Sequence, residues 1–367
     1  MLIGSLLDEI NKKIQELMGK YVILDAYYIR LAVYKAMNLQ GTRKDSSITF
    51  MVDDVFYVLQ KCIRRGISSL NTDCICTVIN HANNILLTEY TEALKKNLSA
   101  SNWTAVSQHL LQGELNNVSG RVQSENAQKK YITHLNDVES STSCIIILHN
   151  ESSEILQKMY LSDPPKRLKV LSCLEAFLQT AKFFDSLLSE TLLKTCSTIF
   201  YKLVDNMLQG LLDLRYVISD EELLMTEVND PFMHAFCDGL KQVMQPFKKY
   251  MTDTNYAKLC RILMPYIARS YEKVVMQMKF NYNGALRLDK DVQYLLSFLT
   301  NLTGISVRNK FYRVLQITCL LTFEKAEEAK EFLLIESDTE RWPFTNKEAR
   351  EILTLRTDYS EEIEQLL

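Results

Sequence analysis

The sequence has 367 residues, a formal net charge of −3 and a pI near 6.1. This balance gives no long-range field that would attract nucleic acid or an anionic bilayer, so it argues against both as direct partners. Only 10 residues are Gly and 6 are Pro, about 4% of the chain, against about 12% in an average protein. Since strand-rich chains need frequent turn residues, the composition predicts an all-α protein with long helices.

The length exceeds what one hydrophobic core usually supports, so we expect two or three helical packing units. No apolar run reaches 18 residues, which argues against a transmembrane span, and the first residues do not form a signal peptide. Nine cysteines follow no zinc or redox spacing and lie mostly among apolar neighbours. They are typical of small buried side chains in a reducing compartment.

The first hundred residues predict three helices from the spacing of their apolar side chains. The first helix runs from Leu6 to about Met37 and is followed by a polar break at 41–47. Its stripe consists of Leu6, Leu7, Ile10, Ile14, Leu17, Tyr21, Leu24, Tyr28 and Leu31. The stripe of the second helix consists of Met51, Val55, Phe56, Leu59, Cys62 and Ile63. Cap residues at 71–73 begin a third helix that reaches about Leu98, and we expect the stripes to be used up in a shared core.

Residues 99–123 are rich in Ser, Asn and Gly and predict a long excursion between helices. Trp103 within it has two open interpretations, local packing or contact with a partner. A long helix follows from about Ser124 to Tyr160. The clearest break in the chain is at 162–165, where two prolines end this helix and Asp163 can cap the next one.

The remaining chain predicts further helices. They are expected at about 165–188, 189–214, 289–303, 305–322 and 324–336, with a short stretch from 219 or 220 and another from 229 to 250. A helix from Thr252-Asp253 carries the apolar stripe Tyr256, Leu259, Leu263, Ile267, Tyr271, Val274 and Met278. Pro265 within it predicts a kink. Residues 281–284 are expected to form the second major turn, and Thr345 and Glu348 fit a capping box at the start of the last helix, which carries Ile352, Leu355 and Tyr359 inward.

No pattern in the sequence nominates catalytic, cofactor-binding or metal-binding residues. The five histidines form no zinc motif, and there is neither a phosphate-binding glycine loop nor a nucleophile elbow. The adjacent acids Asp53-Asp54 and Glu361-Glu362 point in different directions on a helix, so they cannot hold a metal together. We therefore expect a protein that is not an enzyme and needs no cofactor.

Several segments resemble the family of the fourth subunit of the conserved oligomeric Golgi complex. They are 51–57 with Lys61-Cys62, Asn229-Asp230-Pro231, Leu288-Asp289-Lys290, 307–313, and Glu348-Ala349-Arg350 with 353–359. Their order and spacing along nearly the whole chain carry the resemblance, whereas 332–342 departs from the family. The resemblance implies an elongated rod of successive helical bundles. The breaks at 162–165 and 281–284 predict bundles at 1–162, 163–284 and 285–367. It also implies that the chain corresponds to the C-terminal half of the family's proteins.

The resemblance also implies function and one pairing. The expected function is a non-enzymatic subunit of a Golgi vesicle-tethering complex in intra-Golgi retrograde transport and Golgi organisation, acting as a protein-interaction scaffold. Implied partners are the other subunits of that complex, SNARE proteins and Rab GTPases, with indirect association at the cytosolic face of the Golgi membrane. Arg313 and Glu348 are expected to form a partly buried salt bridge; alternatively, Glu348 only caps its helix and Arg313 faces water. The alternative functions are a helical GTPase regulator and a small-molecule-binding helical protein.

Overall fold

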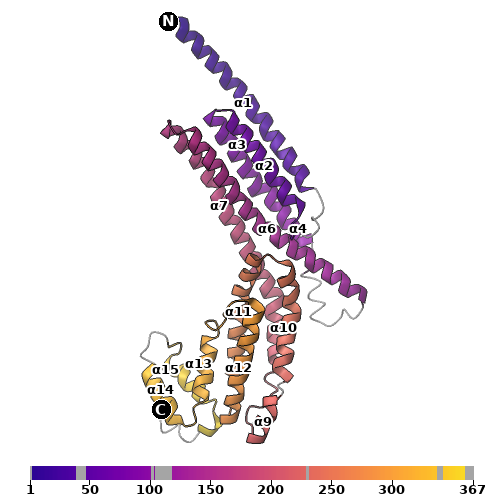
Figure 1. The fold of residues 1–367 in the computed structure, drawn as a ribbon, viewed down its shortest axis with the longest axis vertical. Coiled ribbons are helices and arrows are strands. Elements are labelled where there is room, and N and C mark those ends of the chain that lie inside the picture. Colours follow the sequence, from indigo (N-terminus) through magenta and orange to yellow (C-terminus); the bar gives the residue numbers. More distant parts are fainter. Residues whose placement is uncertain are drawn as a thin grey trace. The chain divides into compact units, whose positions relative to one another are not determined.

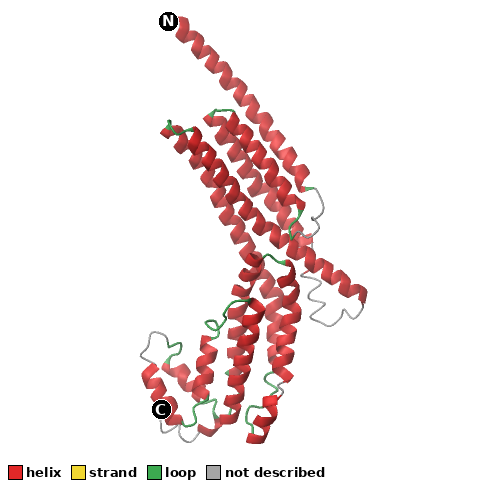
Figure 2. Ribbon diagram, viewed as in Figure 1, coloured by secondary structure: helices red, strands yellow, loops and turns green. Residues whose placement is uncertain are grey.

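The protein is all-α across the residues that its computed structural model describes, namely 2–38, 47–100, 103, 118–228, 231–336 and 342–359. Figure 2 draws no strand in these ranges, and isolated bridges join Phe280 to Tyr216 and to Arg356. The predicted all-α class is therefore confirmed. Several expectations lie wholly or partly outside the described residues: the break at 41–47, most of the 99–123 excursion, the cap at 229–230, Glu361-Glu362 and residues 337–341 of the 332–342 loop.

Two compact units make up the chain. The first contains Met1–Thr191 and Tyr250–Asn255, and the second contains Leu192–Lys249 and Tyr256–Leu367. The three-bundle division at 1–162, 163–284 and 285–367 stays a prediction. Of its two boundaries, 162/163 lies inside the first unit and 284/285 lies inside a helix of the second.

The first unit is built from long helices (Figure 1). They are α1 (Leu2–Met37), α2 (Phe50–Ser68), α3 (Thr72–Ile85), the π-helical turn η1 (Leu86–Tyr90), α4 (Thr91–Ala100), α6 (Val118–Met159) and α7 (Pro164–Thr195). The helix α1 packs on α2 and α3, while α2 and α4 pack on α6. The expected caps are confirmed: the side chain of Asn71 accepts from the Cys74 amide at 3.0 Å, and that of Asp163 accepts from the Lys166 amide at 3.2 Å.

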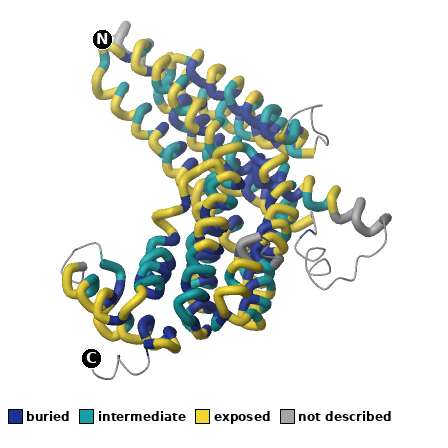
Figure 3. Tube along the Cα trace, turned by 60° about the horizontal axis from the view of Figure 1, so that its bottom comes forward, coloured by how far each residue is buried: buried dark blue, intermediate teal, exposed yellow. Residues whose placement is uncertain are grey.

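The predicted core stripe of α2 is confirmed, but the stripe of α1 is wrong. All six predicted α2 residues are buried. In α1, Ile10, Leu17 and Leu24 are instead exposed, and Figure 3 shows much of this helix as exposed. The helix buries a different apolar face, with Ile29 and Val33 fully enclosed, because that face is the one that meets α2 and α3.

Of the two interpretations of Trp103, local packing is the one that its position supports. Its side chain is 2% exposed and its ring stacks on that of Tyr131 on α6, with centroids 5.5 Å apart. Local packing is therefore confirmed. The helix α6 also begins earlier than the expected start near Ser124, at Val118.

The second unit carries the C-terminal helices. They are η2 (Cys196–Phe200), α8 (Tyr201–Gln209), α9 (Asp220–Val228), α10 (Pro231–Tyr250), α11 (Asp253–Val275), α12 (Tyr282–Thr303), α13 (Tyr312–Leu321), α14 (Ala326–Glu336), α15 (Asn346–Leu353) and η3 (Thr357–Tyr359). Every residue of the predicted α11 stripe is buried, as are the three inward residues expected near the end of the chain. Pro265 lies inside α11, and a kink there stays a prediction.

Three expected boundaries in the second half are wrong. No break separates 165–188 from 189–214, because α7, η2 and α8 follow without interruption and no Gly or Pro lies near residue 188. The segment 281–284 is the cap and first turn of α12, since the Asn281 side chain accepts from the Gly284 amide at 2.9 Å. The third wrong boundary is the start of the helix expected at 305–322, because this helix begins only at Tyr312. Gly304 adopts a left-handed φ of 72° and ends α12, and turns follow it.

Candidate interaction sites

The predicted pair Arg313 and Glu348 lies in a network between α11, α13 and α15. Arg313 Nη2 is 3.0 Å from Glu348 Oε1, and its Nε is 2.9 Å from Glu272 Oε1. The same guanidinium donates to the Pro343 carbonyl at 2.5 Å and lies over the Phe344 ring, 4.3 Å from its centroid. The arginine of α13 thus meets α11, the segment before α15 and α15 itself.

Glu348 has a second set of partners in the capping box of α15. Its backbone amide donates to Thr345 Oγ1 at 3.2 Å, and its Oε2 accepts from the Thr345 amide at 2.7 Å. The backbone bond from Thr345 and the hydrogen bond from Arg313 lower the pKa of Glu348 to about 2. The carboxylate therefore joins helix capping to the arginine network.

A double-mutant cycle measures what this pair contributes. Both side chains are 40% exposed, so we expect a coupling energy of about 1 kcal/mol between Arg313→Ala and Glu348→Ala. Arg313→Ala alone is expected to cost about 2 kcal/mol, since it also removes the partner of Glu272 and of the Pro343 carbonyl. Denaturant unfolding can be followed by Trp342 fluorescence in a Trp103→Phe background. Lys347→Ala, which removes only an exposed pair, is the neutral control, and strictly additive losses would contradict the coupling.

The lowered pKa of Glu348 makes the second unit sensitive to acid. A carboxyl whose folded pKa lies below its ordinary value of 4.5 adds stability that is present above that value and is lost as the pH falls toward 2. We therefore expect Glu348→Gln to flatten the loss of stability between pH 5 and pH 2. Denaturant midpoints at several pH values measure this, with Glu351→Gln as the control; parallel curves for wild type and Glu348→Gln would contradict the assignment.

A second polar network surrounds Arg356, which is 2% exposed. Its Nε and Nη2 donate to the two oxygens of Asp358 at 2.7 and 2.9 Å. Its Nη1 donates to the main-chain carbonyls of Leu321 and Phe323 and to the Tyr359 hydroxyl. Although burial alone would raise the pKa of Asp358, the bonds and charge of Arg356 lower it.

The Arg356 network holds residues 355–359 against the start of α12. Asp358 also accepts from the Tyr282 amide at 3.0 Å. The Phe280 amide donates to the Leu355 carbonyl at 2.9 Å, and the Thr357 amide donates to the Phe280 carbonyl at 2.8 Å. These contacts give residues 355–359 a fixed position on the helices of the second unit.

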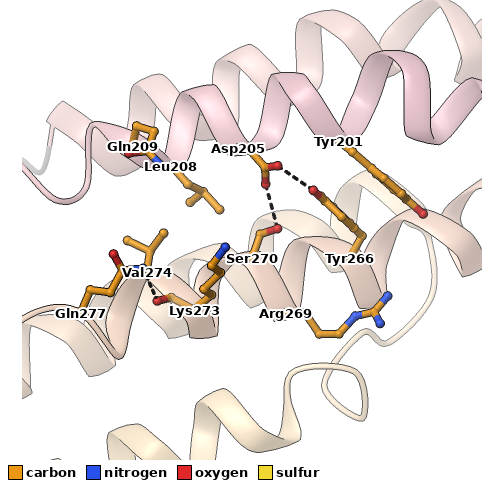
Figure 4. Close-up of a pocket in the computed structure, with 10 residues that line it drawn as sticks. All are labelled: Tyr201, Asp205, Leu208, Gln209, Tyr266, Arg269, Ser270, Lys273, Val274 and Gln277. Atoms are coloured by element: carbon orange, nitrogen blue, oxygen red, sulfur yellow. Dashed lines mark hydrogen bonds between the residues drawn. The ribbon is translucent and has the colours of Figure 1, made fainter.

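A pocket of about 610 Å³ lies between α8 and α11 (Figure 4). Asp205 accepts from the Tyr266 hydroxyl at 2.7 Å and from the Ser270 hydroxyl at 3.0 Å. The rings of Tyr201 and Tyr266 stack with centroids 3.5 Å apart. The remaining lining residues are Leu208, Gln209, Arg269, Lys273, Val274 and Gln277.

Tyr266 in the pocket is not activated as a base. Burial and the bond to Asp205 raise the pKa of Tyr266, so its phenol stays protonated near neutral pH. Elsewhere, burial raises the pKa of Cys196 and of Cys237 to about 12, which keeps both as weakly nucleophilic thiols. Across the described residues, no three His, Cys, Asp or Glu side chains are grouped so that they could hold a metal ion.

Sequence reasoning placed Arg313, Thr345 and Glu348 but missed Arg356 and the α8–α11 pocket. Arg356 lies in the segment 353–359, which resembles the family. That resemblance was the signal that could have pointed to Arg356. The pocket had no such signal. Its central partners, Asp205 and Tyr266, are 61 residues apart and meet only through helix packing.

The fold is shared with a solved helical domain. The crystal structure of the C-terminal domain of the exocyst subunit Sec6p matches this chain with a TM-score of 0.60 at 11% identity, covering 97% of this chain and 91% of that one. The chain is thus an all-α bundle protein with the fold of that domain. No described helix is both long enough and apolar enough to cross a membrane.

Sequence comparison gives the family. The model for conserved oligomeric Golgi complex subunit 4, C-terminal, matches residues 76–351, and the model "COG4 transport protein, middle alpha-helical bundle" matches residues 6–98. Proteins named conserved oligomeric Golgi complex subunit 4 from Homo sapiens and Bos taurus are each 30% identical to 96% of this chain, and the Arabidopsis thaliana protein is 29% identical. The chain belongs to the conserved oligomeric Golgi complex subunit 4 family. It spans about half the length of these relatives, 47% of the human protein.

Proposed function

We propose that this chain is a non-enzymatic subunit of a Golgi vesicle-tethering complex and acts as a helical scaffold for other proteins in intra-Golgi retrograde transport and Golgi organisation. The observation that supports this most is the family match over 96% of the chain, found together with the Sec6p-like fold. Both comparisons point to the same kind of assembly, because each relative's name places it in a multisubunit complex.

The chemistry of the chain fits a scaffold. The polar networks at Arg313 and Arg356 consist of paired, hydrogen-bonded groups that hold helices together, and the pocket at Asp205 uses both carboxylate oxygens internally. A scaffold needs fixed surfaces rather than tuned acids and bases. Rigid helix contacts of this kind would present separate surfaces at constant spacing.

The proposed location is the cytosolic face of the Golgi membrane, reached through partners rather than through lipid. A formal net charge of −3 offers little attraction to anionic headgroups, and direct lipid binding usually needs a polybasic cluster. The proposed partners are the other subunits of the conserved oligomeric Golgi complex, with SNARE proteins and Rab GTPases as further candidates.

Affinity purification of the tagged full chain from cells of its own organism, followed by mass spectrometry, tests this function. We expect enrichment of other subunits of the complex over a control purification with Arg356→Ala, whose second unit should be destabilised. Membrane fractions washed with high salt should lose the chain, as expected for attachment through partners. Recovery of none of these subunits, or faster nucleotide hydrolysis by a co-purified GTPase when the chain is added, would contradict the scaffold proposal.

A further inference from the structure

The helix α1 has two apolar faces, and only one of them is covered within the described chain. The covered face, which includes Ile29 and Val33, packs on α2 and α3. The second face is exposed and consists of Ile10, Ile14, Leu17, Leu24, Tyr28 and Leu31. We call these six residues the α1 face.

The α1 face follows the spacing of a helix-pairing seam. Its residues are separated by steps of four and three, with the half-buried Tyr21 filling the step between Leu17 and Leu24. Steps that alternate in this way place side chains in one line toward a second helix, as in coiled coils. The line extends over 22 residues, from Ile10 to Leu31, or about 32 Å of helix. With Leu17 at 63% and Leu24 at 68% exposure, it leaves a continuous row of large apolar side chains in contact with water, a feature typical of interaction surfaces.

A groove continues the α1 face at its C-terminal end. It has a volume of about 310 Å³ and lies between α1 and the end of α3 with η1, lined by Tyr27, Leu31, Tyr34 and Ile85 among others. Arg30 pairs with Glu89 at 2.8 Å across its rim, which holds the two sides together. A groove of this size accepts one or two large apolar side chains of a docked helix.

The charges beside the α1 face favour an acidic occupant. Lys13 and Lys20 lie one turn before Leu17 and Leu24, and Glu16 bridges them at 2.9 and 3.1 Å. Across α1 there are five Lys or Arg against four Asp or Glu, in a chain whose net charge is −3. The helix is therefore slightly basic, with Lys13 and Lys20 beside the α1 face, and acidic residues on a docked helix would complement these two.

The relatives indicate where such a helix could come from. They are about twice as long as this chain. The middle-bundle family model already matches from residue 6, and the C-terminal model runs to residue 351. Because these models are named for the middle bundle and the C-terminal part of the family, the relatives carry a further part before the region equivalent to α1. We propose that the α1 face and its groove dock an acidic amphipathic helix from the N-terminal half of subunit-4 chains.

Peptide binding to the full chain tests this docking surface. The probes are overlapping 35-residue peptides that tile the part of the human and Arabidopsis thaliana relatives preceding the matched region, with binding measured by fluorescence polarisation. We expect binding by peptides that combine the alternating apolar spacing with Asp or Glu beside it. Leu24→Glu should weaken binding at least tenfold, and Lys13→Glu with Lys20→Glu should weaken it and shift preference toward basic peptides. Leu168→Glu, at another exposed leucine of the first unit, should leave binding unchanged.

Other results would overturn the proposal. Binding that survives Leu24→Glu, or that is equally strong for acidic and basic peptides, would remove the α1 face as the specific site, and so would a complete lack of binding. If the chain elutes as a dimer that Leu24→Glu separates, the occupant is a second copy. Circular dichroism of each variant excludes misfolding. This surface can fail while the proposed function stands, because recovery of other complex subunits does not depend on α1 binding a helix of its own family.

Discussion

Arg356→Ala is expected to lower the free energy of unfolding of the second unit by about 3 kcal/mol. The guanidinium is enclosed and donates to Asp358, to Tyr359 and to two main-chain carbonyls. Removing it leaves the carbonyls of Leu321 and Phe323 in a site that water cannot easily enter. Because Asp358 is itself 39% exposed, part of its lost pairing is replaced by water, which keeps the expected cost below that of a fully buried pair.

The measurement is denaturant unfolding followed by Trp342 fluorescence in the Trp103→Phe background. Arg350→Ala is the matched control, since Arg350 is an exposed arginine six residues earlier. Arg356→Lys is also expected to be costly, because an ammonium cannot donate to both carboxylate oxygens and both carbonyls in one plane. A loss for Arg356→Ala no larger than that for Arg350→Ala would contradict the role of the network.

Features of the fold that depend on neighbouring residues could be predicted from the sequence. The α11 stripe is buried as expected, because a helix face of seven apolar residues is stabilised by packing against a core. The caps at Asn71 and Asp163 form because a side-chain oxygen reaches an amide only three residues away.

Features that depend on which surfaces meet could not be predicted in this way. The sequence of α1 contains two apolar faces, and its periodicity alone does not say which face α2 and α3 cover. Periodicity favours the more regular stripe, whereas the face with Ile29 and Val33 is the buried one. The turn expected at 281–284 failed for a related reason. Its Asn and Gly residues are typical of turns, but here they cap and begin a helix whose first turn is pressed against Tyr216.

In the candidate sites too, contacts between residues close in the sequence could be predicted, whereas contacts between distant residues could not. The capping box could be read from the pattern of Thr345 and Glu348, which lie three residues apart. The position of Arg313 beside Glu348 was expected only through the family resemblance, since 35 residues separate them. Its contact with Glu272 was not expected at all. Long-range polar partners leave no trace in the periodicity of one sequence, because each of them looks like an ordinary surface charge until the helices pack.

Gly284→Ala is expected to destabilise the second unit by about 3 kcal/mol or more, at the upper end of the cost of overpacking. An added Cβ would lie 1.6 Å from the Tyr216 carbonyl oxygen and 2.6 Å from its carbon. The backbone of residues 216–218 cannot move freely, because Asn281 forms hydrogen bonds with both Tyr216 and Ile218. Its amide donates to the Tyr216 carbonyl at 3.3 Å, and its side chain donates to the Ile218 carbonyl at 2.7 Å and accepts from the Ile218 amide at 3.1 Å.

The opposite sign is expected for Gly19→Ala, which makes that variant the matched control for Gly284→Ala. Nothing lies within 4 Å of a Cβ added at Gly19, and the residue is in the interior of α1. Alanine there should stabilise the helix by about 0.5–1 kcal/mol, since it restricts the unfolded chain more than glycine does. Thermal melts followed by circular dichroism, with Trp342 fluorescence for the second unit, measure both changes. If Gly284→Ala melted at the wild-type temperature, the close approach of α12 to the segment at Tyr216 would be wrong, and with it the reason why a glycine begins this helix.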